Sequence, residues 1–486
     1  MIEEFVKIHD KFSVEMKLRF IARRKLKVSE FAVNTWIFIP SGLDINRNTY
    51  TKENFYRDIK SNIRLVTPVY LLRDIASGDQ SPILQLTSSF EAMASDPSRT
   101  KIGEYEYHIK MFLSILKSSL RDEIAHIISN NIPDDAAFLV ESYCSNIKSI
   151  TERYRGLRRI INTPTVGKDL LNYFLFGDEF MSNLVEQHTF KLFSALKENK
   201  SFGKKTFQSG LLQLIDCEIK YKREKGYPVI EKDDFTRNRE LIFRFNLLKK
   251  YAESELFLKG KKKRDGVLVE QIYFSLAAGI SMIFATTIAF SFQQTYGNFT
   301  MPFFVALVIS YMLKDRIKEL SRYYFAHKLG SRYFDHKTEM ALNNQEIGFI
   351  KEAMDFIPNE KVPSNVMKVR DRSAILEANN RFDTEKIILY RKLVSLNRQS
   401  LDLCSKYPTA GMNDIIRLNV MNYVQKMDNP IVPLYYPDQE TGYQIVKSER
   451  IYYINMVVQL IHDGETQLRR YRVILNRKGI REIEKF

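Results

Sequence analysis

The sequence IYFSLAAGISMIFATTIAFSF, residues Ile272–Phe292, contains no charged side chain. As an α-helix its 21 residues would be about 31 Å long. The hydrocarbon core of a bilayer is about 30 Å thick, so the stretch is predicted to be a membrane-spanning helix. The alternative is a buried helix of a soluble core, because such helices are also apolar on all sides.

A second uncharged stretch, Phe299–Leu313, follows after the short polar segment Gln293–Asn298. Its 15 residues would form a helix of about 22 Å. This length is below the thickness of the hydrocarbon core, so the span would need local thinning or interfacial anchoring. Together the two stretches predict a central transmembrane helical hairpin with one short leg.

Basic residues flank the predicted hairpin at both outer ends and are missing from its turn. They are Lys259, Lys261, Lys262, Lys263 and Arg264 before the first span, and Lys314, Arg316, Lys318 and Arg322 after the second. By the positive-inside rule, both termini are predicted to be cytoplasmic in a multi-pass protein of the inner (plasma) membrane. The predicted partners are the lipid bilayer and its anionic headgroups, which attract juxtamembrane Lys and Arg.

Small residues recur every fourth position in both spans, a spacing that lets helix backbones approach closely. They are Ser275, Ala277, Gly279, Ser281, Ala285, Ala289, Ala306 and Ser310. The spacing fits packing within the hairpin or packing between protomers in a homo-oligomer. Neither span contains Asp, Glu, Lys or Arg, so no ion or proton path is marked.

The chain has 74 Lys and Arg against 58 Asp and Glu, a formal charge of +16 over 486 residues. Such a charge fits nucleic acid, an anionic membrane surface or dispersed surface residues. Basic residues also gather in Lys148–Arg159 and Arg450–Lys485, but the densest cluster adjoins the predicted hairpin. The membrane explains this cluster most simply, and nucleic acid is the weaker alternative.

Composition indicates globular domains outside the hairpin, with 44% hydrophobic and 27% charged residues. The three cysteines, Cys144, Cys217 and Cys404, are too far apart in sequence for a zinc motif or a disulfide framework. They suit a reducing compartment. The N-terminus lacks the basic and apolar regions of a secretory signal peptide.

Residues 1–258 are predicted to form an N-terminal cytosolic domain of strands followed by helices. Phe12–Phe20 alternates apolar and polar side chains, as a half-buried strand does, and Phe31–Ile39 reads as a more buried strand. Apolar residues then recur with helical spacing, which predicts a small sheet plus a helical bundle. The predicted helices are Glu104–Asn130, Asp134–Ile161, Gly167–Asn199, Lys204–Lys225 and Asp234–Leu258, the last running towards the membrane.

Residues 259–329 hold the basic flank, the hairpin and a juxtamembrane helix, Lys314–Leu329. Residues 330–486 are predicted to form a C-terminal cytosolic domain with an antiparallel sheet, so the fold class is α+β. Asp463-Gly464 predicts a type I′ hairpin turn between two strands. The predicted strands are Glu346–Ile357, Val366–Arg372, Lys386–Leu396, Arg450–Ile461 and Thr466–Asn476, with a helix at Asn413–Met427.

The sequence contains no phosphate-binding glycine motif, no nucleophile elbow and no spaced histidine pair for a metal, so no cofactor, metal or catalytic residue is predicted. The most suggestive polar cluster follows the early strands, where loops often carry ligand sites. It includes Asp44, Arg47, Tyr50 and Arg64. An anionic ligand there competes with an ordinary solvated turn.

The first functional hypothesis is a non-enzymatic, membrane-anchored scaffold or interaction protein that self-associates or binds a protein partner. The second is a membrane-disrupting or pore-forming effector gated by its cytosolic domains, motivated by the short second span. The third is a membrane-tethered enzyme with its site near Asp44–Thr67. The missing catalytic motifs favour the first.

Overall fold

The structure is a computed structural model that describes residues 1–23, 26–130, 132–162, 167–198, 208–298, 300–324, 333–343, 345–372, 385–440 and 442–486. The chain forms two compact units. One consists of Met1–Ile63, Lys259–Lys406 and Ala410–Phe486, and the other of Arg64–Leu258 and Tyr407–Thr409. The fold class is mixed α+β with antiparallel sheets, as the sequence predicts.

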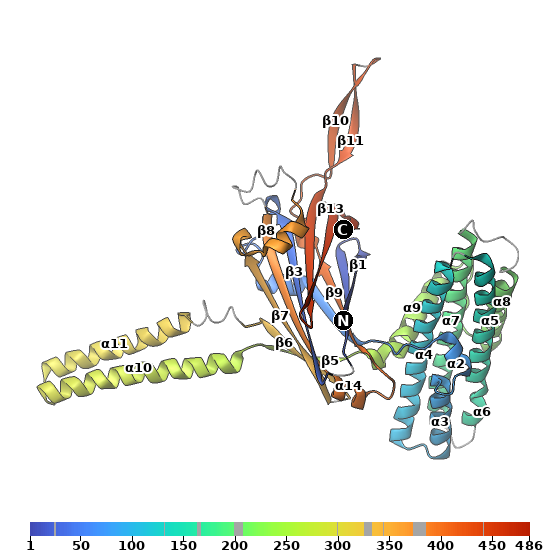
Figure 1. The fold of residues 1–486 in the computed structure, drawn as a ribbon, viewed down its shortest axis with the longest axis horizontal. Coiled ribbons are helices and arrows are strands. Elements are labelled where there is room, and N and C mark those ends of the chain that lie inside the picture. Colours follow the sequence, from blue (N-terminus) through green and yellow to red (C-terminus); the bar gives the residue numbers. More distant parts are fainter. Residues whose placement is uncertain are drawn as a thin grey trace. The chain divides into compact units, whose positions relative to one another are not determined.

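The first unit contains two larger sheets and a separate two-stranded ribbon (Figure 1). In the four-stranded sheet the order is β1 (Ile2–Asp10), β2 (Ser13–Ile21), β9 (Gly411–Asn419) and β4 (Ile59–Leu65). The eight-stranded sheet has the order β14 (Gly479–Lys485), β13 (Glu465–Asn476), β12 (Tyr452–His462), β3 (Val28–Pro40), β8 (Glu385–Asn397), β7 (Gln345–Ile357), β6 (His336–Leu342) and β5 (Lys259–Arg264). The ribbon is β10 (Ile431–Asp438) with β11 (Gly442–Glu449).

All neighbouring strands of the eight-stranded sheet are antiparallel. The shorter elements of this unit are η1 (Ser41–Leu43), α1 (Lys52–Asp58), η5 (Asn359–Lys361), α12 (Ser364–Arg370), α14 (Arg398–Cys404) and α15 (Met421–Val424). Its two long helices are α10 (Val267–Tyr296) and α11 (Met301–Tyr324).

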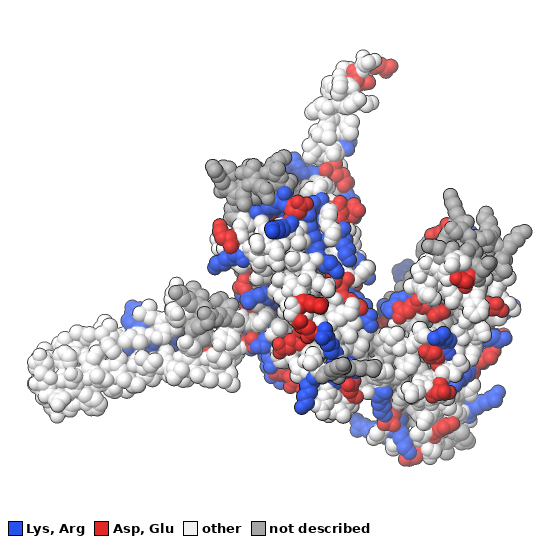
Figure 2. All heavy atoms as spheres, viewed as in Figure 1, with Lys and Arg blue, Asp and Glu red and all other residues white. Residues whose placement is uncertain are grey.

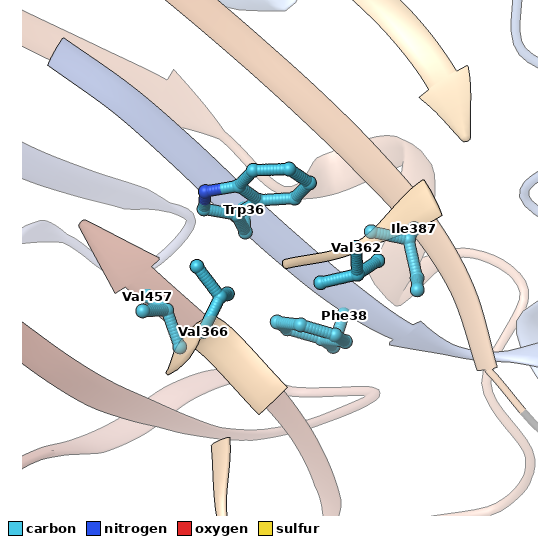
Figure 3. Packing of buried hydrophobic residues seen from close by; sticks show 6 residues of the cluster. All are labelled: Trp36, Phe38, Val362, Val366, Ile387 and Val457. Carbon is cyan, nitrogen blue, oxygen red and sulfur yellow. The ribbon is translucent and has the colours of Figure 1, made fainter. Parts of the chain in front are cut away.

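Strand β3 lies at the centre of the larger sheet, between β12 and β8, and is buried on both faces. Trp36 and Phe38 point from β3 into an apolar cluster, which Figure 3 shows closed by Val366 of α12 and Val457 of β12. This agrees with the buried strand predicted at Phe31–Ile39. The position explains why the sequence there is apolar on both faces and not alternating.

The strand pairings join the two ends of the chain. Because β3 pairs with β12 and β8, and β2 pairs with β9, N-terminal strands complete sheets made of C-terminal strands. The sequence-based division into 1–258 and 330–486 therefore cuts through both sheets, although the boundary at 258 coincides with that of the compact units.

Two predicted elements of the C-terminal part have the wrong type. Val366–Arg372 was predicted as a strand, but α12 is a helix whose Val366 is buried in the cluster around Trp36. Asn413–Met427 was predicted as a helix, but it contains strand β9, which pairs along β2, and then the short α15. In both cases tertiary packing overrides a weak local pattern.

The other four strands predicted in the C-terminal part are present as β7, β8, β12 and β13, whereas β6, β10, β11 and β14 were not predicted. Asp463 and Gly464 have φ angles of 51° and 80° in the turn between β12 and β13. Positive φ at both central positions is the type I′ geometry predicted there.

The second unit is a helical bundle, as predicted from residue 104 to residue 258. Its helices are α2 (Leu72–Ser77), α3 (Pro82–Ser95), α4 (Arg99–Ser129), α5 (Pro133–Gly156), α6 (Arg158–Ile161), α7 (Lys168–Glu198), α8 (Gln208–Lys225) and α9 (Phe235–Glu253), followed by η2 (Ser254–Leu256). The last helix does not run into the hairpin, because η2 and then strand β5 separate α9 from α10.

Candidate membrane interface and adjoining pockets

Glycines mark both ends of α10. Gly266 precedes the helix at φ 73°, and a Cβ atom there would lie 3.1 Å from the ring of Tyr333. Gly297 follows the helix at φ 76°, a conformation that glycine adopts without strain. The next helix begins at Met301, and Phe299, the predicted start of the second span, lies outside the described residues.

The helices α10 and α11 pack side by side as a hairpin (Figure 1). The residues they bury are small: Ala277, Ser281, Ala285, Ala306 and Ser310. These small residues, spaced four apart, therefore pack within the hairpin, which is the first of the two packing alternatives. The other members of the pattern, Ser275, Gly279 and Ala289, are exposed or half-buried.

Hydroxyl groups of the hairpin are satisfied by its own backbone. Ser281 donates to the carbonyl of Ala278 at 2.8 Å, and Ser310 donates to that of Leu307 at 3.0 Å. Thr287 donates to the carbonyl of Ile283 in the same way. These groups need no water, so they are compatible with an apolar surrounding.

The outer surface of the hairpin is apolar towards its tip, where Figure 2 shows almost no charged atoms; blue atoms of lysine or arginine begin about halfway along it. Its exposed large side chains include Leu276, Ile280, Met282, Ile283, Phe290, Phe304, Val305, Val308, Ile309 and Met312. Soluble proteins rarely expose a continuous apolar surface of this extent, so something other than water must cover it.

Of the helices in the described residues, one is long and apolar enough to cross a membrane, Val267–Tyr296. The second leg does not meet this standard. Its uncharged part, Met301–Leu313, has 13 residues, or about 20 Å of helix. Charged residues then follow on α11 at Lys314, Asp315, Arg316, Lys318, Glu319 and Arg322.

A contact between the two legs shows which part of α10 lies beside the charged residues of α11. The guanidinium of Arg322 lies 5.3 Å from the ring centroid of Phe274, near the start of the apolar run of α10. Within α11 itself, the ammonium of Lys314 lies 3.6 Å from the ring centroid of Tyr311. The charged half of α11 therefore runs beside the first apolar turns of α10, and only the tip half of the hairpin is apolar on both legs.

The basic flank Lys259–Arg264 is an exposed strand, β5, at the edge of the larger sheet. Three of its residues form ion pairs: Lys262 with Glu352 at 3.8 Å, Lys263 with Glu339 at 2.7 Å and Arg264 with Glu270 at 3.1 Å. Charged edge strands also resist pairing with a second sheet, which is an additional reason for lysines here.

A pocket of about 830 Å³ lies where β5 leads into α10. In its wall Lys52 lies 2.7 Å from Asp335, and the hydroxyl of Tyr56 donates to Asp335 at 2.9 Å. Burial raises the pKa of Tyr56, and the nearby carboxylate adds to this. Burial and the Lys262 ammonium lower the pKa of His336. Cations and anions are paired with each other here, so these side chains stabilise the junction of β5 and α10.

Between the two sheets lies a buried charge network centred on Lys392 of β8. Its ammonium contacts Asp414 of β9 and lies 3.0 Å from Glu352 of β7, and Ser61 of β4 donates to Asp414 at 2.6 Å. Burial alone would raise the pKa of Glu352, but Lys392 and the hydroxyl of Tyr390 outweigh it and lower the pKa to about 2. The network links four strands; its three charged groups are buried, whereas Ser61 is exposed.

The residues of the predicted ligand loop do not converge. Arg47 donates to the carbonyl of Phe356 at 2.5 Å and lines a pocket of about 790 Å³. The carbonyl of Asp44 accepts from Lys426, and Tyr50 donates to Asp58 at 2.8 Å. Arg64 belongs to the helical unit, where it lies 3.6 Å from Glu253.

Part of the basic cluster Lys148–Arg159 is used inside the helical unit. Arg155 lies 2.7 Å from Glu218 and 3.3 Å from Asp178, both buried, and Arg153 donates to a backbone carbonyl. These guanidinium groups are therefore committed to packing and do not form a phosphate-binding surface.

Within the described residues, no group of three or more His, Cys, Asp or Glu is arranged to hold a metal. The predicted end of the juxtamembrane helix at Leu329 lies outside them. Compared with known proteins, the chain matches no family model, and no curated protein or solved structure is significantly similar to it.

Proposed function

We propose that the protein is a membrane-anchored interaction protein whose α10–α11 hairpin lies in the bilayer. The observation that supports this most strongly is the apolar outer surface of the two legs, which pack against each other through alanine and serine. Lipid tails can cover such a surface without polar partners, because the backbone and hydroxyl groups bond within each helix.

Both ends of the hairpin lie on one side of the membrane in this proposal, since α10 and α11 are antiparallel neighbours. The charged half of α11 sets the depth. Lys314, Arg316 and Lys318 would lie at the headgroups, with their long side chains reaching towards water. The tip half, about 20 Å long on each leg, would enter the hydrocarbon region and require thinning to reach the far side.

The side with both chain ends would be the cytoplasm of a cell with an inner (plasma) membrane. Basic residues at Lys259–Arg264 and on α11 support this orientation by the positive-inside rule. Anionic lipids on that side would attract each α11 residue at the headgroups by about 1 kcal/mol.

A second exposed apolar surface, the β10–β11 ribbon, supports the interaction part of the proposal. Tyr435 and Ile445 face each other across the strands, and the Tyr435 and Tyr443 ring centroids lie 5.6 Å apart. Tyrosine offers a large apolar area with a polar end, which suits a protein interface. A partner protein or a second copy would bind here.

Extraction of membranes at alkaline pH tests the anchor. The double variant Ile283→Lys with Ile309→Lys places two ammonium groups on the apolar surface of the hairpin, where each costs up to about 3 kcal/mol, the value for the bilayer centre. We expect the native chain to stay in the membrane pellet and this variant to move to the soluble fraction or to aggregate.

The matched control is Phe138→Lys with Leu403→Lys, which places the same charges at exposed apolar positions outside the hairpin. Phe138 is 71% exposed and Ile283 is 66% exposed, so the two changes remove comparable surface. If native chain and control are both extracted as easily as the hairpin variant, the anchor is wrong.

A further inference from the structure

Three arginines line a pocket of about 500 Å³ in the sheet unit, and a fourth, Arg470, is close enough to Arg370 to act on its charge. Arg370 ends α12, Arg372 follows it, and Arg470 and Arg472 project from the same face of β13. The pocket is lined by Arg370, Arg372, Arg472, Glu385, Tyr453 and Asn455, among others. Its volume is in the range of small-molecule sites.

One buried carboxylate serves two of the arginines. Glu385 accepts from Arg370 at 2.6 Å and from Arg372 at 2.9 Å, and all three are buried. Of the other acidic partners, Asp371 also lines the pocket and Glu484 does not. Asp371, 3.2 Å from Arg470, has a side chain that is 78% exposed, and Glu484 lies 3.1 Å from Arg472. Positive charge therefore exceeds negative charge in the buried part of the cluster.

Several buried polar atoms in this cluster have no hydrogen-bond partner within the described part of the chain. They are Nε of Arg370, Nε and Nη2 of Arg470, and Oδ1 of Asn455. Arg370 is 3% exposed and Asn455 is 2% exposed, and both line the pocket. Buried donors of this kind cost stability unless a partner is supplied.

Burial lowers the pKa of Arg370, and the neighbouring Arg470 and Arg372 lower it further, against the opposing effect of Glu385. An anion in the pocket would relieve this crowding of positive charge. The planar, forked guanidinium group matches phosphate and carboxylate oxygens better than an ammonium does.

We propose that this pocket binds the phosphate group of a small phosphate monoester. The phosphate would contact Arg370, Arg372 and Arg472, and a hydroxyl of the ester would donate to Oδ1 of Asn455. The organic part would lie against Tyr453, whose ring centroid is 5.3 Å from the guanidinium of Arg472. Phosphate is favoured over carboxylate because three guanidinium groups border one space.

Isothermal titration of the full chain in non-ionic detergent and phosphate-free buffer tests the proposal. The probes are sn-glycerol 3-phosphate and, as the uncharged match, glycerol. We expect a sub-millimolar Kd for the phosphate ester and no heat with glycerol. A parallel arm uses vesicles containing phosphatidic acid, because a lipid headgroup carries the same monoester. Binding to these vesicles alone would assign the phosphate to a lipid.

Two variants test whether the ester binds in this pocket. Arg472→Gln removes a half-exposed arginine, and Arg370→Gln with Glu385→Gln removes one buried charge of each sign, leaving Arg372 with its 2.8 Å bond to Asn359. Each is expected to weaken binding at least tenfold. Arg481→Gln is the control, since Arg481 pairs with Glu449 at 2.7 Å outside the pocket.

Fluorescence of Trp36 reports whether each variant retains the folded sheet. The proposal is overturned if the folded native chain binds neither probe. It is equally overturned if folded Arg472→Gln and the double variant bind as tightly as the control.

Discussion

Replacing Glu352 by Gln should destabilise the sheet unit in a way that depends on pH. Glu352 is buried, 3.0 Å from Lys392, and its pKa is lowered from 4.5 to about 2. At 1.36 kcal/mol per pKa unit, this shift corresponds to about 3 kcal/mol of stability at pH 7. Removing one partner of a buried ion pair destabilises proteins by about 3–5 kcal/mol, which agrees with this value.

The sign follows from the lowered pKa. The contribution of the Glu352 carboxylate is fully present well above pH 4.5 and is lost as the pH falls towards 2. The difference in the free energy of unfolding between the native chain and Glu352→Gln should therefore be smaller by about 2 kcal/mol at pH 3 than at pH 7. A glutamine cannot be protonated in this range, so the variant lacks this part of the acid sensitivity.

The assay is urea unfolding of the full chain in detergent, followed by tryptophan fluorescence. The chain has a single tryptophan, Trp36, which is buried on β3, so the signal reports the sheet unit. Glu482→Gln, an exposed change on β14, is the control and should be within about 0.5 kcal/mol of the native chain. A loss below 1 kcal/mol at pH 7, or a loss that is the same at both pH values, would refute the reasoning.

Three further changes test other parts of the structure. Gly348→Ala places a Cβ atom 2.0 Å from the carbonyl oxygen of Ser395 at a φ of 150°, so the free energy of unfolding reported by Trp36 should fall by at least about 2 kcal/mol; an unchanged value would contradict this backbone geometry. Arg155→Met leaves buried Glu218 without its 2.7 Å partner, so the free energy of unfolding measured by helical circular dichroism in urea should fall by about 3 kcal/mol; an unchanged midpoint would show that the network is dispensable. Ala285→Leu overfills the helix contact, so cross-linking between cysteines placed on the two legs should weaken, and unaltered cross-linking would oppose tight packing within the hairpin.

Local patterns predicted much of the fold. The alternation in Phe12–Phe20, the turn at Asp463-Gly464 and the long helices are encoded within short windows, so they could be recognised in the sequence. Strand β9 could not, because Asp414 interrupts its apolar pattern. The buried charge of Asp414 is balanced by Lys392 on another strand.

The membrane region was partly predictable for a similar reason. The apolar run of α10 is continuous in the sequence, whereas the level of the α11 charges depends on the contact between Arg322 and Phe274. The arginine pocket was missed because its members lie about a hundred residues apart. The available signal was the two-residue spacing of Arg470 and Arg472, which places both on one face of a strand.

The location of the hairpin tip is the most direct test of the central claim. An environment-sensitive fluorophore is attached to single cysteines at Phe290 and Val308, in a full chain whose three native cysteines are replaced by serine, and the protein is reconstituted in vesicles with nitroxide-labelled lipids. The control site is Phe138, which is 71% exposed against 69% for Phe290. The account predicts blue-shifted emission and strong quenching by acyl-chain nitroxides at both hairpin sites and neither effect at Phe138. Water-like emission without quenching at Phe290 and Val308 would contradict it.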